Sequence, residues 1–495
     1  MSAAAVSERV AELAPAVRAR LAQHEDELIA LADEIWAQPE LGLEERAASA
    51  AQRALLERHG FAVQTGVAGM ETAFTAHCDV GAGGPAIGLL GEFDALPGLS
   101  QDRVPRRKPL VEHGPGHGCG HNLLGAGSLG AALVAAAVAR ERGIPLRVVY
   151  FACPAEEGAI GKVVMAREGL FDGLDVALCW HPDELSTPWN GSCLALDGLR
   201  FRFAGRSAHA AFDPHNGRSA LDAVELMNVA VNYLREHVGP DARIHYTIRR
   251  GGEAPNVVPD EAVSDYVVRE RTRADVERLR ERVLDCARGA ALMTGTTGQW
   301  KLTAACADLL PNEAVEDVLL DALRAVGPPA FDERDRAFAR AIRATLPEAQ
   351  VAGGLRLRGV PEDLHDAVLH ERVDAPYRPA GVWHLSTDVG DVSWNTPTSQ
   401  LWIATMPIGT PAHSWQLTAA SGAPIGHKGM LTAAGALALA AVELARSPER
   451  LDAAAAELRR RTAGQPYVSP LPPEGIPSGH LAPLDEDDGA GWEAL

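Results

Sequence analysis

The pattern of apolar and polar residues predicts that much of the chain alternates between short strands and helices. Residues 5–36 are rich in Ala, Leu, Glu and Arg, with apolar residues at helical spacing, which predicts an opening helix. Beyond residue 61, short β-type runs alternate with Ala-rich helical stretches, typical of an α/β domain whose mostly parallel sheet is covered by helices. The clearest of these elements are Ala86–Leu90, Leu123–Arg142, Arg147–Cys153 and Val176–Trp180.

A different pattern occupies residues 195–308. Two predicted strands and two predicted helices follow one another there: Leu196–Ala204, Ser219–His237, His245–Ile248 and Ala274–Met293. An α+β unit of this size is typical of a separate domain.

After residue 311 the sequence again has a helical pattern, which ends in a long Ala/Leu helix predicted over Leu431–Arg446. We therefore expect a discontinuous catalytic α/β domain, made of residues 1–194 and 309–465, with an α+β domain inserted at 195–308. Residues 466–495 are rich in proline and contain the acidic run Asp485–Asp488, so we expect this tail to be partly extended.

Composition and charge narrow the possible partners. The 495 residues include 46 Lys and Arg against 66 Asp and Glu, a net charge of −20, which disfavours nucleic acid and anionic membranes. The longest nearly pure apolar run, Leu129–Ala139, is far shorter than the ~20 residues of a membrane helix. The first 20 residues carry five charges and no apolar signal core, and the seven scattered cysteines are unlike a disulfide framework. We therefore expect a reduced, cytoplasmic protein acting on a small molecule.

The most informative segment is the glycine-rich stretch 114–123, which precedes a predicted helix. Cys119 and His121 are one residue apart, and the glycines allow the backbone to turn so that both side chains approach one ion. Thiolate and imidazole suit Zn²⁺ or a similar divalent metal. By itself, the pair fits equally a buried structural cysteine beside a capping histidine.

The glycines at 125, 127 and 130 match the dinucleotide fingerprint G-x-G-x-x-G. That motif requires a strand directly before it, whereas Cys119-Gly-His-Asn precedes this one. The glycines are better explained by close packing of the helix on the sheet, and a NAD-dependent oxidoreductase stays an alternative from a different class.

Two further predicted strands end in residues suited to metal chemistry. Arg147–Cys153 leads to Glu156 and Glu157, and the next strand ends at His181. Adjacent side chains in extended backbone point to opposite sides, so one glutamate can bind a metal while the other takes a proton from bound water. A solvated acidic turn and a structural histidine are the simpler explanations of each motif alone. Three successive strand ends with such residues are harder to assign to packing.

Taken together, these motifs resemble the M20 family of metal-dependent amidohydrolases and peptidases, in the branch with a Cys-Gly-His motif. The likeness spans residues 30–445. Residues 118–125, 386–393 and 427–430 are similar to the aminobenzoyl-glutamate hydrolase branch. The resemblance implies two divalent metal ions, Zn or Mn, as cofactors. The metal ligands that it implies are Cys119, His121, Glu157, His181 and His413. His413 is preferred to His427, which is expected to have a structural role.

The resemblance also assigns roles in hydrolysis of a small amide bond. Glu156 is implied as general base toward a metal-activated water, and Asp94 as the acid that orients a metal ligand, although Asp94 also fits a turn cap. The inserted domain is implied to be a lid and dimerisation domain, in a homodimer or in a heterodimer with a homologous subunit. Its His209 would polarise the scissile carbonyl, often in the neighbouring subunit, and Asn256 and Arg269 would bind substrate. A loop histidine, a turn residue and a surface ion pair are the simpler explanations of these three.

Two positions depart from the family pattern. Glu92 stands where many members have a metal-binding histidine, and its role is open. Asn122 stands where the branch usually has aspartate, so metal affinity at one position is expected to differ. A dipeptidase, an N-acyl-amino-acid deacylase and a catalytically silent partner subunit are the other functions that this pattern allows.

Overall fold

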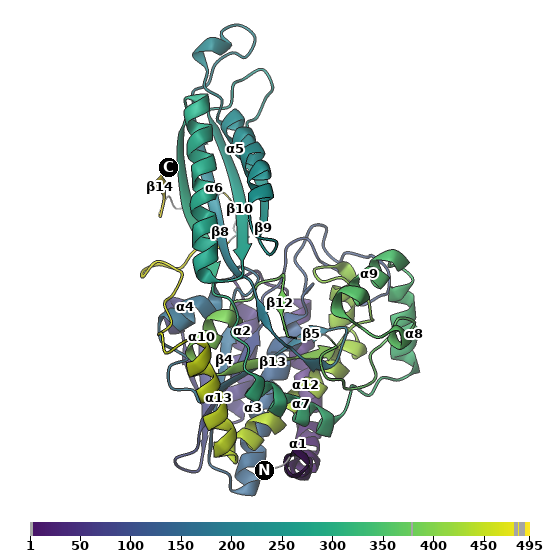
Figure 1. Ribbon diagram of the computed structural model, residues 1–495. Coiled ribbons are helices and arrows are strands. Elements are labelled where there is room, and N and C mark those ends of the chain that lie inside the picture. The colour runs from purple at the N-terminus through teal and green to yellow at the C-terminus, as the bar shows by residue number, and fades with distance from the viewer. Residues whose placement is uncertain (1–2, 378–379, 480–483, 485–490) are drawn as a thin grey trace.

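The computed structural model describes residues 3–377, 380–479, 484 and 491–495. Figure 1 shows a broad body of helices around a sheet, from which an elongated second body projects. The acidic run Asp485–Asp488 of the predicted tail lies outside the described residues.

The broad body is built on a seven-stranded mixed sheet with the order β1-β2-β4-β3-β5-β13-β6. Its strands are β1 (Ala62–Thr65), β2 (Phe74–Val80), β3 (Ala86–Glu92), β4 (Leu146–Cys153), β5 (Val176–Asp183), β6 (Thr187–Pro188) and β13 (Thr398–Ala404). The four central strands β4, β3, β5 and β13 are parallel, and the outer strands pair antiparallel. The predicted α/β class is confirmed, with the parallel pairing confined to the centre of the sheet.

Helices cover both faces of this sheet, so the central strands are apolar on both sides. One face packs against α2 (Arg46–Arg58), α3 (His121–Arg142), α7 (Glu313–Val326) and α12 (Pro424–Ala445), with α1 (Ala3–Ala37) and α13 (Pro448–Arg461) outside these helices. The other face packs against α4 (Gly161–Arg167) and α10 (Val389–Asn395). Among the described residues, α3 and α12 are apolar and long enough to span a membrane, yet 94% and 83% of their most apolar windows are buried in this core.

The glycines of the G-x-G-x-x-G match lie inside α3, at its contacts with neighbouring elements. A Cβ atom at Gly127 would lie 2.8 Å from the Trp180 ring, and one at Gly130 would lie 2.6 Å from Leu28. These glycines therefore allow α3 to pack closely on β5 and α1. No described strand runs directly into them, which removes the structural basis of the dinucleotide alternative.

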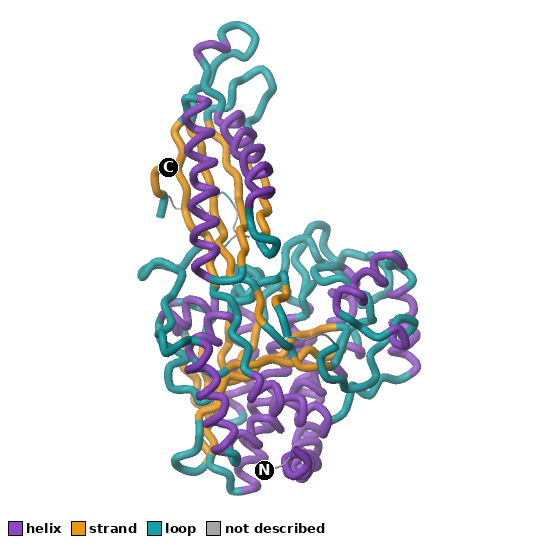
Figure 2. The backbone as a smooth tube through the Cα atoms, in the orientation of Figure 1, coloured by secondary structure: helices purple, strands orange, loops and turns teal. Residues whose placement is uncertain are grey.

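The elongated body is a five-stranded antiparallel sheet of order β14-β11-β8-β10-β9, with two helices on one face (Figure 2). Its elements are β8 (Ala195–Ala204), α5 (Ala220–Leu234), β9 (Arg243–Arg250), β10 (Glu261–Glu270), α6 (Arg273–Thr294), β11 (Thr297–Cys306) and β14 (Glu493–Ala494). A separate core of residues from α5, α6 and the sheet stabilises it. β10 and β11, which the sequence pattern did not indicate, supply two of its long strands.

The remaining elements lie mainly in the connections. They are the helices α8 (Glu333–Arg343), α9 (Glu348–Arg358) and α11 (Trp415–Ser421), the paired strands β7 (Ser192–Cys193) and β12 (Val382–Trp383), and the 3₁₀ turns η1 (Val67–Gly69), η2 (Pro214–Asn216), η3 (Arg235–His237) and η4 (Glu362–Leu364).

The tail returns from α13 to the elongated body. Leu471 is buried in the broad body, the Gly479 amide donates to the Thr303 carbonyl at 2.9 Å, and β14 pairs with Gln299 and Trp300 of β11. The last strand thus covers the β11 edge of the smaller sheet.

Candidate metal centre

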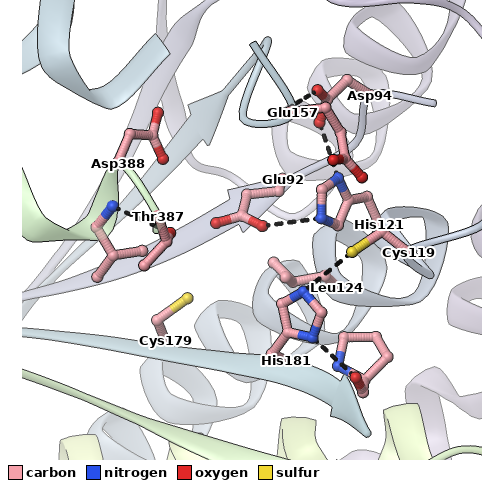
Figure 3. Close-up of polar contacts among 12 residues, drawn as sticks. Glu92, Asp94, Cys119, His121, Leu124, Glu157, Cys179, His181, Thr387 and Asp388 are labelled. Carbon is pink, nitrogen blue, oxygen red and sulfur yellow. Dashed lines mark hydrogen bonds and ion pairs between the residues drawn. The ribbon is translucent and has the colours of Figure 1, made fainter. Parts of the chain in front are cut away.

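The loops that follow β3 and β4, the carboxyl end of β5 and the start of α3 meet beside the central sheet. Figure 3 shows Glu92 and Asp94, Cys119 and His121, Glu157 and His181 directed toward one another from these four segments. Functional groups gather at the carboxyl ends of parallel strands because the connecting loops of adjacent strands lie side by side there.

Cys119 and His121 reach this point because the backbone turns at Gly120. Gly120 has φ of +79°, and a Cβ atom there would lie 3.0 Å from Pro182, so glycine is required for both conformation and space. The Cys119 Sγ atom lies 3.4 Å from Nε2 of His181. The His121 and His181 rings lie edge to face, 5.8 Å apart between centroids. The thiol and both imidazoles therefore converge.

Asp94 fixes the orientation of His121. Its Oδ1 atom lies 2.8 Å from Nδ1 of His121, and its Oδ2 accepts from the Glu157 amide at 2.9 Å. Burial raises the pKa of the Asp94 carboxyl, but the adjacent His121 overcomes this effect and holds the pKa below its ordinary value. With Nδ1 engaged by a carboxylate, Nε2 is the nitrogen that His121 presents to an ion.

Glu156 and Glu157 lie on a tight turn after β4. Ala155, which precedes them, has φ of +54°, an unusual conformation for a residue with a side chain, and its amide donates to Glu45 Oε1 at 2.8 Å. Burial raises the pKa of Glu157 to about 7, and burial followed by the nearby Glu92 and Asp388 charges raises the pKa of Glu156 well above its ordinary value. Both carboxylates are therefore poorly compensated without further positive charge.

His413 completes the cluster from the loop before α11. Its amide donates to the Gly118 carbonyl at 3.0 Å, which fixes the loop to the Cys119 segment, and its Nε2 lies 3.4 Å from Oε2 of Glu157. The His413 side chain is 54% exposed, against 8% for that of Glu157. Burial of its surroundings lowers its pKa to about 4, which favours the neutral imidazole that binds metals.

At this centre the potential ligand atoms of the described residues fall into three groups in which all atoms lie within 4.8 Å of one another. These groups are Cys119–His121–His181, Cys119–Glu157–His413 and Glu92–His121–Glu156. The first two share Cys119, which is the arrangement expected of two adjacent cation positions with a common ligand.

The residues present fit divalent cations. Buried polar atoms of this cluster have no hydrogen-bond partner among the described residues: Oε2 of Glu92, Nε2 of His121 and Oε1 of Glu157. Oε2 of Glu92 and Nε2 of His121 contact each other as an ion pair at 3.2 Å, and a cation would engage all three atoms. Sulfur, imidazole and carboxylate donors together suit Zn²⁺ or a similar first-row ion.

The other residues predicted for the site lie elsewhere in the same chain. His209 and Asn256 lie in the loops 205–218 and 251–259, at the end of the elongated body that points away from the broad body (Figure 1). Arg269 lies at the junction of the two bodies, where its Nε donates to Ser386 Oγ at 3.1 Å. The structure thus does not bring His209 or Asn256 to the metal centre of their own chain.

Two positions left open by the sequence have structural contacts. His427 lies within α12, with Nε2 3.0 Å from Asp33 Oδ1, and belongs to none of the three ligand groups. The Asn122 amide donates to the carbonyls of Ala32 and Ser421, so it joins α3 to α1 and α11. The expected effect of Asn122 on metal affinity has no support in these contacts.

Sequence reasoning missed two buried charged residues behind the centre, Lys162 and Asp388. Lys162 is fully buried between Glu92 and Asp388, with its Nζ 2.7 Å and 2.5 Å from their carboxylate oxygens. A lysine that follows a glycine at the start of an apolar helix gives little signal. Asp388 lies in the segment 386–393, which the sequence distinguishes only by its family likeness.

A converging Cys, His and Glu centre on an α/β domain, with an α+β domain inserted between its halves, defines a class of hydrolases. The chain belongs to the M20 family of peptidases and amidohydrolases, and residues 195–292 match the family's peptidase dimerisation domain. The chain is 40% identical to a subunit of the p-aminobenzoyl-glutamate hydrolase of Escherichia coli, over 90% of this chain and 95% of that protein. It is 29% identical to the Xaa-Arg dipeptidase of Mus musculus over 89% of this chain and 90% of that protein.

Solved structures share the fold. An aminobenzoyl-glutamate utilization protein from Klebsiella pneumoniae matches with a TM-score of 0.57 and 18% identity, over 86% of this chain and 98% of that one. A dinuclear metal binding peptidase of the M20 family from Bacillus subtilis matches with a TM-score of 0.55 and 18% identity, over 86% and 99%. At this identity the likeness concerns the fold.

Proposed function

We propose that the protein hydrolyses a small amide bond that joins an aryl or acyl group to an amino acid, with aminobenzoyl-glutamate as the model substrate. The observation that carries this proposal is the pair of ligand groups that share Cys119, beside the half-buried carboxylate of Glu156. The 40% identity to a subunit of an aminobenzoyl-glutamate hydrolase supports the choice of substrate.

Two divalent ions, Zn or Mn, would be held by Cys119, His121, Glu157, His181 and His413. Bound there, they would supply Lewis-acid activation of water and of the amide carbonyl. Asp94 would hold His121 in the tautomer that presents Nε2. Glu156 and Glu157 lie on a turn rather than in the extended backbone expected from the sequence, and the bond of the Ala155 amide to Glu45 would fix this turn.

Glu156 is proposed as the proton carrier. It is not needed for either of the Cys119-containing ligand groups, and its raised pKa makes it a stronger base than an exposed glutamate. In this role it accepts a proton from the attacking water and delivers it to the leaving amine nitrogen. The same carboxyl thus acts first as base and then as acid.

We further propose that the active unit is a dimer in which His209 acts in the partner's site. Apolar side chains are exposed together on the α5 and β9 side of the elongated body: Leu226, Val229, Tyr233 and Ile248. In the sheet as described, β9 is the edge strand on that side, whereas β14 covers the opposite edge. A second copy packed along α5 and β9 would bury these side chains. In such a dimer, the loops 205–218 and 251–259 of each copy would lie away from the broad body of that copy.

This arrangement predicts complementation between two inactive variants. A Glu156→Gln chain keeps His209, and a His209→Ala chain keeps Glu156, so a mixed dimer has one complete site. Random pairing is expected to restore about a quarter of the wild-type activity. The measurement is activity after joint refolding or co-expression, with each variant alone as the control. Absence of any recovery in demonstrated mixed dimers would contradict the shared site.

Substrate class is tested with the purified, metal-loaded chain on a panel of amides. The panel contains p-aminobenzoyl-glutamate, Xaa-Arg dipeptides and N-acetyl amino acids, and we expect the highest kcat/KM for the first, abolished by chelator. A preference for either other class would favour the dipeptidase or deacylase alternative. Hydrolysis only after addition of a homologous subunit would favour the silent-partner alternative, which two relatives named as enzyme subunits keep open.

Asn256 and Arg269 are proposed to bind substrate, Asn256 together with His209 from the partner and Arg269 from the domain junction. Arg269 is partly buried there, and burial lowers its pKa. A guanidinium in such a place suits a substrate carboxylate, which a glutamate-containing amide provides. We also propose a reduced, cytoplasmic location, because seven scattered cysteines are unlike a disulfide framework.

A further inference from the structure

Lys162 is a buried cation whose role none of the residues assigned above explains. Its Nζ atom lies 2.7 Å from Oε1 of Glu92 and 2.5 Å from Oδ1 of Asp388, and its side chain is entirely inaccessible to solvent. A buried ammonium costs several kcal/mol of desolvation, so a well-packed apolar side chain would often stabilise the fold equally well. The fold alone therefore gives little reason for a lysine here.

Asp388 holds Lys162 at two points. One carboxylate oxygen accepts from the ammonium, and the other accepts from the Lys162 backbone N–H at 2.8 Å. Asp388 directly precedes α10, and Lys162 lies in the first turn of α4. This double contact fixes the ammonium in position, because the backbone and the side chain of Lys162 are both tied to one carboxylate.

Glu92 lies between this pair and the metal centre, as Figure 3 shows for Asp388, Glu92 and His121. Its Oε1 atom is bound to Lys162, while its Oε2 atom lies 3.2 Å from Nε2 of His121. Neither Oε2 nor Nε2 has a hydrogen-bond partner among the described residues. Because Asp94 engages the other ring nitrogen, both atoms lie on the side of His121 that would face an ion.

We propose that Lys162 and Asp388 are positioning residues for Glu92, and that the free oxygen of Glu92 binds the cation held by His121. This inference rests on the proposed metal-dependent function. A separation of 3.2 Å is suited to two ligands of one ion, and ligating carboxylates are themselves commonly held by hydrogen bonds from outside the site. The ammonium also offsets one of the negative charges of Glu92, Glu156 and Asp388, so that they can be buried together.

The test is titration of the metal-free protein with Co²⁺, whose visible spectrum reports the geometry and ligands of each bound ion. The variants are Glu92→Gln, which removes the free oxygen but keeps the Lys162–Asp388 pair, and Lys162→Met/Asp388→Asn, which removes the clamp at similar volume. The control is Asp391→Asn, because Asp391 is a buried carboxylate of α10 that contacts Tyr467 and Ala307 rather than Lys162. Thermal melting of each metal-free protein is recorded in parallel.

We expect Glu92→Gln and Lys162→Met/Asp388→Asn each to bind one of the two Co²⁺ ions about 10- to 100-fold more weakly, with a changed spectrum. The control Asp391→Asn is expected to match the wild type. Wild-type Co²⁺ affinity and spectrum in Glu92→Gln would overturn the inference, with the metal centre itself intact. A Glu92→Gln protein that no longer melts cooperatively would also overturn it, because Glu92 would then act through folding. Failure of the wild type to bind Co²⁺ would instead contradict the proposed function.

Discussion

Replacing Glu156 by glutamine is expected to lower kcat by about 10²–10⁴-fold while the fold and the metal content stay unchanged. Glutamine has the same shape and keeps an oxygen acceptor, but it cannot take a proton. Glu156 lies in neither group that contains Cys119, so its neutralisation leaves those ligands intact. Neutralising a carboxyl whose pKa is already raised is also expected to increase thermal stability at neutral pH.

The matched variant is Glu157→Gln, which changes the adjacent glutamate on the same turn. Glu157 contacts His413 and belongs to a ligand group, so this variant is expected to lose metal as well as activity. The two variants are compared by steady-state kinetics and by metal analysis of the same samples. Near-normal kcat in Glu156→Gln would eliminate it as the proton carrier, and loss of metal in Glu156→Gln would reassign it as a ligand.

Replacing Cys119 by alanine is expected to remove both ions and reduce activity to background. Cys119 is common to two ligand groups, so a single substitution withdraws one ligand from each cation position. Loss of an outer partner of a ligand already costs about 10- to 100-fold in metal affinity, and loss of a shared ligand should exceed that range. Burial raises the pKa of this thiol far above its usual range, so in the metal-free protein it is protonated and metal binding must release the proton.

The control for this prediction is Cys78→Ala, a buried cysteine of β2 whose Sγ accepts from Arg140. Metal content and activity are expected to change in Cys119→Ala only. Competition with a chelator of known affinity measures the loss at each position. Retention of one tightly bound ion in Cys119→Ala would show that Cys119 is a terminal rather than a shared ligand.

The sequence predicted the framework of the fold well where local pattern decides it. The central strands β3, β4 and β5 contain the predicted apolar runs, because strands covered on both faces carry few polar residues. β13 was not indicated, since Thr398, Ser399 and Gln400 interrupt its apolar pattern although all its residues are buried. The helix α12 begins at Pro424, seven residues before its predicted start, because proline suits the first helical turn.

The sequence likewise predicted those residues of the candidate site that occur in local motifs, and missed those that depend on tertiary contacts. Cys119, His121, Glu156 and Glu157 occur in short motifs, and their convergence follows from strand ends that local sequence indicates. The clamp of Lys162 and Asp388 joins residues 226 positions apart, and nothing in the sequence around either residue predicts that contact. The exposure of apolar side chains on α5 and β9 likewise depends on which face of α5 packs on the five-stranded sheet. That is a property of the tertiary structure.

The central claim is that these side chains hold a pair of divalent cations, and elemental analysis of the purified chain tests it most directly. Protein loaded with Zn²⁺ or Mn²⁺ and then dialysed is expected to retain about two ions per chain, and to lose them together with amidase activity on treatment with chelator. Fewer than one ion per chain, with amide hydrolysis unaffected by chelator, would contradict it.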